Sequence, residues 1–142
     1  MDFGQSIKTC FSKFFDFSGR ARRSEYWWFY LFSAITSIVL GWVPLLGLVT
    51  LVLVIPGLSA GARRLHDTGR SGWWQLSTWI PGLIGLVLVG LSFVPKPEEP
   101  DVVLLSAGGL FWLVSAVMWI VLTVFMATDT VPGNNQYGPP PK

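Results

Sequence analysis

Charged side chains are scarce in this sequence, and they are unevenly spread along it. Asp, Glu, Lys and Arg make up 13% of the 142 residues, whereas soluble domains usually carry about 25%. Residues 26–62, 71–95 and 102–128 contain none of them. This shortage excludes an ordinary soluble domain and indicates long apolar stretches that lie in a membrane.

Cysteine and histidine each occur once, as Cys10 and His66. A single cysteine excludes a disulfide within the chain. A metal centre needs three or four ligands, and these two residues stand 56 positions apart. We therefore expect no metal, no cofactor and no assigned catalytic residue.

The uncharged stretches are long enough for four membrane crossings. A helix needs about 20 apolar residues to cross the hydrocarbon layer, so the first stretch fits two crossings with a turn at residues 41–44, and the others fit one each. The sequence predicts an all-α, polytopic membrane protein whose four transmembrane helices form two hairpins. The expected helices are residues 25–43, 46–64, 72–94 and 102–127.

The distribution of lysine and arginine predicts the orientation, because these residues accumulate in short cytoplasmic loops. With four crossings, nine basic residues fall on the side of the two termini, and only Lys96 falls on the other side. We therefore expect three parts: a cytoplasmic basic segment 1–24, a transmembrane domain 25–128, and a cytoplasmic Pro- and Gly-rich tail 129–142.

Residues 2–17 have the pattern of an amphipathic helix. At 100° per residue, polar side chains fill one arc and the other holds Phe3, Ile7, Cys10, Phe11, Phe14 and Phe15. Such a helix lies in the membrane surface with its rings among the acyl chains; packing against the helix bundle is the alternative. Indole rings favour the same headgroup level, and the expected interface anchors are Trp27, Trp28, Trp73 and Trp74.

Two predicted helices contain the tetrapeptide IPGL, at residues 55–58 and 80–83. Pro56 and Pro81 each kink a helix by removing a backbone hydrogen bond. Paired interruptions in neighbouring helices are typical of transporter binding sites, so a small transporter or channel-like component is the second hypothesis. Against it, no helix interior contains the ionisable residue that ion- or proton-coupled carriers keep inside the membrane.

The segment GARRLHDTGRSGWW, residues 61–74, gathers unusual chemistry between two apolar stretches. His66 beside Asp67 has the residue types of a general base and its orienting carboxylate. Adjacent residues seldom point at one another productively, and no serine or cysteine nucleophile accompanies them at a recognisable spacing. An embedded enzyme is therefore the third hypothesis. We favour a structural role, in which Asp67 or Thr68 caps the next helix or Asp67 pairs with Arg63.

The first hypothesis is a binding surface at the level of the lipid phosphates. Guanidinium groups bind phosphate through two parallel hydrogen bonds, and each basic residue near an anionic leaflet adds about 1 kcal/mol of attraction. Glu25 and Asp67 are expected to pair with some of the arginines. The expected partners are anionic lipid headgroups or a membrane protein and not nucleic acid, since no soluble domain presents the arginines, which are Arg20, Arg22, Arg23, Arg63, Arg64 and Arg70.

Three motifs resemble a known family: FSGRARRSEYWWF (17–29), GARRLHDTGRSGWW (61–74) and PGNNQYGPPP (132–141). In this order they resemble the bacterial inner-membrane family catalogued as domain of unknown function 805. The resemblance implies a small integral protein of the bacterial cytoplasmic membrane and supplies no activity. Because all three motifs are expected on the cytoplasmic side, we expect them to meet there. The candidate binding residues are Arg20, Arg23, Arg63, Arg64, His66, Asp67 and Arg70, with Asn135 and Tyr137 packed on them.

Overall fold

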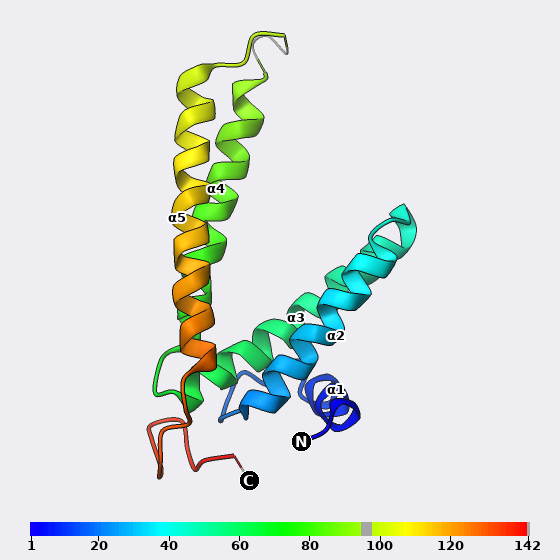
Figure 1. Ribbon diagram of the computed structural model, residues 1–142, viewed down its shortest axis with the longest axis vertical. Helices are drawn as coiled ribbons and strands as arrows, with labels where there is room; N and C mark the ends of the chain where they lie inside the picture. Colours follow the sequence, from blue (N-terminus) through cyan, green and yellow to red (C-terminus); the bar gives the residue numbers. More distant parts are fainter. Residues whose placement is uncertain (95–97, 142) are drawn as a thin grey trace. The chain divides into compact units, whose positions relative to one another are not determined.

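The computed structural model describes residues 1–94 and 98–141, and within these ranges it is helical with no β strand. The elements are α1 (Phe3–Ser12), α2 (Arg23–Leu40), α3 (Pro44–Asp67), the short 3-10 helix η1 (Gly72–Gln75), α4 (Leu76–Ser92) and α5 (Val102–Ala127) (Figure 1). The prediction of an all-α protein is confirmed.

Three helical segments are long and apolar enough to cross a membrane: Leu46–Asp67, Gly72–Ser92 and Val102–Ala127. These correspond to three of the four expected crossings. The α2 helix is not among them, because Arg23 and Glu25 stand in its first turn and hydroxyl and aromatic side chains lower its hydropathy. A crossing by α2 therefore stays a prediction.

The α3 helix continues beyond residue 64, where the sequence predicted its end, so that Asp67 is helical as well as the central arginines Arg63 and Arg64. Its end is fixed at Gly69, which adopts a left-handed φ of 76°. The N–H of Gly69 donates to the carbonyl of His66 (3.0 Å), and that of Arg70 donates to the carbonyl of Leu65 (2.9 Å). This pair of bonds is the Schellman arrangement that terminates helices at a glycine. The cap thus places Arg63, Arg64 and Asp67 in the last two turns of α3.

The chain divides into two compact units, residues 1–72 with 125–142, and residues 73–124. The N-terminal segment and the tail both belong to the first unit. In the first unit α2 and α3 lie side by side, and α1 lies against the end of α2 that begins at Arg23 (Figure 1). Its apolar core contains Cys10, Phe29, Leu53 and Ala60.

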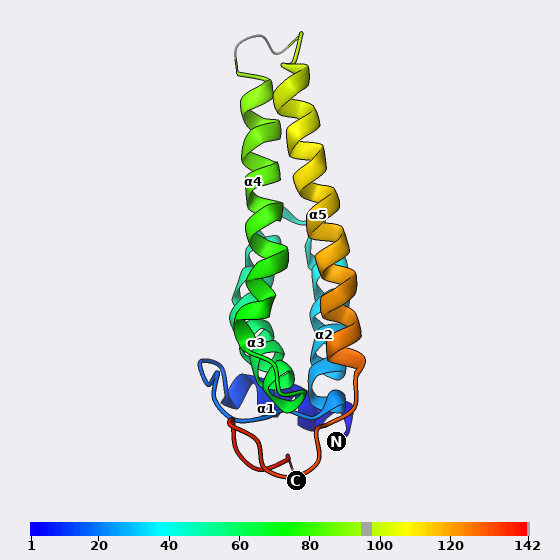
Figure 2. The same ribbon diagram turned by 90° about the vertical axis from the view of Figure 1, so that its left-hand side faces the viewer.

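The second unit is the hairpin of α4 and α5, which lie side by side in both views (Figure 2). Glycine allows the close approach: a Cβ atom at Gly108 would meet the carbonyl oxygen of Gly85 at 2.9 Å and Val89 Cγ2 at 2.6 Å. Small residues are the usual means by which membrane helices approach one another. Two further hydrogen bonds join the helices, from Ser115 Oγ to the Thr78 carbonyl (2.8 Å) and from Trp112 Nε1 to the Gly82 carbonyl (3.2 Å).

Candidate functional site: a buried arginine cluster

The candidate site lies in the first unit, where five charged side chains are buried together. We call it the arginine cluster; its members are Arg20, Arg63, Arg64, Glu25 and Asp67. Glu25 comes from the first turn of α2, Arg20 from the connection before α2, and the others from the end of α3. The expectation that Glu25 and Asp67 pair with arginines is confirmed.

Asp67 is the centre of one half of the arginine cluster. Its Oδ1 atom accepts from Arg20 Nε at 2.9 Å, and its Oδ2 atom accepts from Arg64 Nη1 and from Thr130 Oγ1. All three charged side chains are shielded from solvent. The carboxylate therefore joins the connection before α2, the end of α3, and the tail.

Arg63 forms the other half, where it pairs with Glu25 through Nη1. The predicted pairing of Asp67 with Arg63 is wrong, and so is capping of the next helix by Asp67 or Thr68. Thr68 instead ends α3, and its hydroxyl donates to the Leu65 carbonyl at 2.9 Å. Successive helical side chains point about 100° apart, so Arg63 faces α2 while its neighbour Arg64 faces the tail.

Arginine also binds the tail through its backbone oxygens. Arg20 donates to the carbonyls of Val131 (2.6 Å) and Gly133 (2.7 Å). Arg64 donates from Nε to the Met126 carbonyl (3.0 Å) and from Nη2 to the Thr128 carbonyl. The last carbonyls of a helix have no partner within it, so Arg64 satisfies groups at the end of α5 that the helix leaves free.

The single histidine holds the tail in a different way. The rings of His66 and Tyr137 stack with centroids 3.8 Å apart and an interplanar angle of 5°. His66 Nδ1 lies 3.1 Å from the Gly19 carbonyl oxygen, and Asn135 Nδ2 donates to the His66 carbonyl at 2.9 Å. The prediction that Asn135 and Tyr137 pack on this region is confirmed. His66 and the Asp67 carboxylate have separate hydrogen-bond partners.

Arg23 and Arg70 lie at the edge of the cluster. Arg23 donates to the carbonyls of Ala127 and Thr128 and pairs with Asp129 at 2.9 Å. The side chain of Arg23 is 45% exposed and that of Asp129 is 91% exposed. Exposed ion pairs of this kind contribute at most about 1 kcal/mol to stability. Arg70 lies over the ring of Phe125, 4.0 Å from its centroid.

The structure thus separates the expected arginines into two groups. Arg20, Arg63 and Arg64 are buried, whereas Arg22 and Arg70 are half-buried and Arg23 is exposed. Sequence reasoning placed all six at the lipid surface, because the groups that cover the buried three are distant in sequence. Arg20, for example, bonds to a carboxylate 47 residues away and to a carbonyl 113 residues away.

Cys10 of α1 lies beside Arg63 and Glu25. Its thiol is fully buried, with Sγ 4.0 Å from the Glu25 carbonyl oxygen. Burial raises the pKa of the thiol to about 12; the Glu25 carboxylate adds to this effect and the Arg63 guanidinium opposes it. The cysteine therefore stays a neutral thiol near neutral pH, and its part in the cluster is packing.

The four tryptophans expected as interface anchors differ in exposure, and the two prolines expected to kink helices both lie inside helices. Trp28 packs its ring edge-on against Phe3 of α1, at 5.7 Å between centroids. Trp27 is half-buried, whereas Trp73 and Trp74 are exposed. Pro56 lies inside α3 with its side chain buried, and Pro81 lies inside α4, in the other compact unit.

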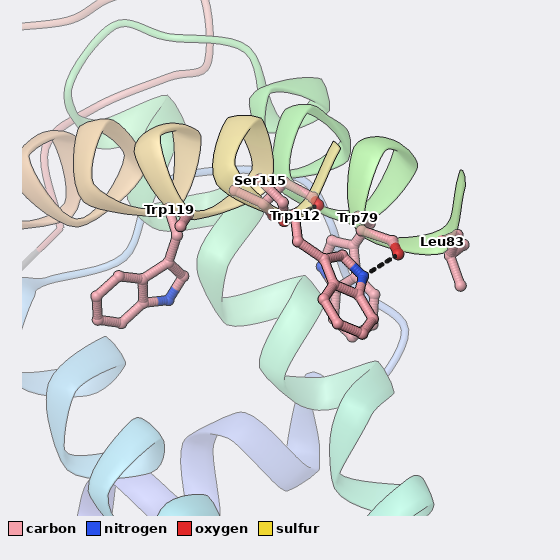
Figure 3. A pocket seen from close by; sticks show the side chains of 8 residues that line it. Trp79, Leu83, Trp112, Ser115 and Trp119 are labelled. Atoms are coloured by element: carbon pink, nitrogen blue, oxygen red, sulfur yellow. Dashed lines mark hydrogen bonds between the residues drawn. The ribbon is translucent and has the colours of Figure 1, made fainter. Parts of the chain in front are cut away.

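A groove of about 600 Å³ lies on the α4–α5 hairpin. Trp79, Trp112 and Trp119 line it together with Leu83 and Ser115 (Figure 3). The sequence-based predictions do not include this groove, although the spacing of seven between Trp112 and Trp119 places both rings on one face of a helix. Its walls are largely apolar, and the hydroxyl of Ser115 and the indole of Trp112 donate to backbone carbonyls of α4.

Proteins similar to this chain are named as membrane proteins. A model of the family described as "Protein of unknown function (DUF805)" matches residues 14–139. Inner membrane protein YhaI of Escherichia coli K12 is 36% identical over 135 residues, covering 89% of this chain and 86% of that protein. Inner membrane protein YhaH of the same strain is 31% identical over 139 residues, covering 89% and 87%. No solved structure matches the chain.

Proposed function

Because the chain belongs to the family of unknown function DUF805, we propose that it is a four-helix protein of a bacterial cytoplasmic membrane. In this proposal α2, α3, α4 and α5 cross the bilayer as two hairpins, and both termini are cytoplasmic. The apolar faces of α3, α4 and α5 support the crossings. The basic residues support the orientation, since nine of the ten fall on one side.

Reporter fusions test this topology directly. Alkaline phosphatase is active only outside the cytoplasm, so a fusion after Arg70 is expected to be inactive and a fusion after Glu99 active. The matched measurement uses a fluorescent protein that folds in the cytoplasm, for which the pattern is reversed. Activity of the Arg70 phosphatase fusion contradicts the orientation.

The function that we propose is non-catalytic binding of anionic lipid headgroups at the cytoplasmic face. The observation that carries it is the accessibility of five further cations in the unit that contains the buried arginine cluster: Lys8 and Arg23 are exposed, and Lys13, Arg22 and Arg70 are half-buried. Aromatic side chains that favour a membrane interface lie in the same unit, and Phe15 is 74% exposed. Each such cation adds about 1 kcal/mol of attraction to an anionic surface.

The α1 helix packs against α2 and α3 and also leaves aromatic rings exposed. Its side chains Ser6 and Cys10 are buried against α2 and α3, while Phe3 and Phe11 stay exposed beside aromatic rings of α2. We propose that α1 lies at the membrane surface with these rings among the acyl chains. A membrane protein that covers the same face is the alternative partner in this proposal.

Lipid-dependent stability tests the proposed binding. In detergent, added phosphatidylglycerol is expected to raise the unfolding temperature more than added phosphatidylcholine, and 0.5 M salt is expected to remove the difference. Replacing Lys8 and Lys13 by glutamine should reduce the phosphatidylglycerol effect, whereas replacing both by arginine should preserve it. Equal stabilisation by the two lipids contradicts the proposal.

No catalytic step belongs to this proposal. His66 is engaged by Tyr137 and Gly19, and the Asp67 carboxylate by Arg20, Arg64 and Thr130. A His66→Ala variant is accordingly expected to loosen the tail while keeping the preference for phosphatidylglycerol. If the His66→Ala variant keeps a folded tail but no longer supports the function of the protein in the cell, the non-catalytic proposal is contradicted.

A further inference from the structure

The buried charges of the arginine cluster do not balance. Among the described residues, the buried charged side chains are three arginines and two carboxylates, which leaves one positive charge. An uncompensated charge inside a protein is strongly destabilising. The exposed Asp129 carboxylate does not compensate it, because its partner is Arg23 at the surface. One further negative charge is needed to neutralise the arginine cluster.

The unbalanced charge is located at Arg63. Every nitrogen of the Arg20 and Arg64 side chains donates to a carboxylate or a carbonyl oxygen. Arg63 uses Nη1 for Glu25, while its Nε and Nη2 atoms have no hydrogen-bond partner in the described part of the chain. These two nitrogens form one edge of the guanidinium plane, the edge that presents two parallel N–H groups. Charge and hydrogen-bonding capacity are thus both unsatisfied at the same atoms.

We propose that this edge of Arg63 binds the phosphodiester of one membrane phospholipid. A phosphodiester carries a single negative charge and two non-bridging oxygens, so it supplies both the charge and the two acceptors. Bidentate binding of phosphate by arginine is a favoured geometry. The site rests on the proposed membrane location, but it does not require the lipid to carry a net charge.

The position of Arg63 fits a lipid phosphate. It stands four residues before the end of α3, at the end of the helix where the headgroups of the proposed cytoplasmic leaflet lie. The cover over it is α1, whose two polar contacts with α2 are long: Ser6 Oγ to the Ser24 carbonyl at 3.4 Å, and Cys10 Sγ to the Glu25 carbonyl at 4.0 Å. A neutral thiol cannot balance a guanidinium. A headgroup that enters beside α1 replaces this weak contact with a charged one.

Native mass spectrometry of the full chain, extracted from its membrane in mild detergent, tests the proposal. The wild-type chain is expected to retain one phospholipid, and Arg63→Lys is expected to reduce the retained fraction by about tenfold, since lysine keeps the charge but lacks the two-donor edge. Arg23→Lys is the matched control, because Arg23 lies at the exposed rim. Absence of a retained phospholipid in the wild type, or equal retention by Arg63→Lys, overturns the proposal.

A second variant separates binding from folding. Glu25→Gln removes the carboxylate partner of Arg63 and so raises the buried positive charge while keeping the two-donor edge of Arg63. Its retention of phospholipid is expected to equal or exceed that of the wild type. If both variants lose the lipid together, the loss follows from disruption of the α2–α3 contact, and the phosphate site is overturned.

The nature of the ligand is tested after delipidation by adding back phosphatidylethanolamine, phosphatidylglycerol or inorganic phosphate. Both lipids contain a phosphodiester, so retention of one molecule of either, dependent on Arg63, supports the site. Retention of inorganic phosphate alone overturns the lipid source. Failure of the proposed surface binding would give a different result. In that case the preference for phosphatidylglycerol disappears while the single Arg63-dependent phospholipid remains.

Discussion

Asp67 joins three segments of the chain through one carboxylate. It accepts hydrogen bonds from Arg20, Arg64 and Thr130, and both of its arginine partners are buried. Loss of this acceptor leaves two guanidinium groups inside the protein without their counter-charge. At this scale the cluster is a structural ionic core whose stability depends on pairing.

Replacement of Asp67 by asparagine is therefore expected to destabilise the protein by about 3–5 kcal/mol, because removing one partner leaves a buried charge uncompensated. Thermal unfolding in detergent, followed by circular dichroism, measures the change. Asp129→Asn is the control, since that carboxylate is 91% exposed and its loss should shift the unfolding temperature little. Equal shifts for the two variants contradict the assignment of Asp67 as the central acceptor.

Cys10 allows a prediction that depends on pH. The pKa of its thiol is raised from 9.0 to about 12 in the folded chain, so folding favours the protonated form. Its contribution to stability is fully present below pH 9 and is lost as pH rises toward 12. We expect the native thiol to resist iodoacetamide at pH 8, where the unfolded chain reacts readily. Rapid alkylation of the native protein at pH 8 contradicts this.

At the scale of elements, the α4–α5 hairpin depends on glycine at one crossing point. Gly85 and Gly108 face one another closely enough that a side chain on either meets the opposite helix. The neighbouring Gly109 has no atom within 4 Å of the position of a Cβ. The two adjacent glycines therefore have opposite roles, one in packing and one facing outward.

Alanine substitutions distinguish them. Gly108→Ala is expected to destabilise the hairpin by about 1–3 kcal/mol through overpacking, whereas Gly109→Ala is expected to stabilise α5 by up to about 1 kcal/mol through its helix propensity. Unfolding of both variants in the same detergent gives the comparison. A similar destabilisation by the two substitutions contradicts the close approach at Gly108.

At the scale of the whole chain, the sequence predicted the helical class, three helices that are long and apolar enough to cross a membrane, and the meeting of the three motifs. It did not predict which arginines are buried. For Arg20 that outcome depends on carbonyl oxygens of the tail that lie more than 100 residues away, and backbone acceptors have no signature in a sequence. The Arg63–Glu25 pairing likewise joins residues that lie 38 positions apart in the sequence.

The stack of Tyr137 on His66 helps to hold the tail on the first unit. Removal of the ring in Tyr137→Ala eliminates the stack on His66, and aromatic pairs contribute about 0.5–1.5 kcal/mol. Protease cleavage within residues 129–141 is accordingly expected to accelerate by about two- to tenfold in the variant. Gln136→Ala, at an exposed neighbouring position, is the control. Cleavage at the wild-type rate contradicts the role of the stack.

Backbone oxygens, and not side chains, are what Arg20 and Arg64 recognise between Met126 and Gly133. A peptide carbonyl is the same whichever amino acid bears it, so exposed positions such as 131 and 134 tolerate exchange of residue type. Deleting a single residue there moves every following oxygen by one position and disconnects it from its guanidinium. Evolution of these exposed positions is consequently free in residue type, whereas the length of the segment is constrained.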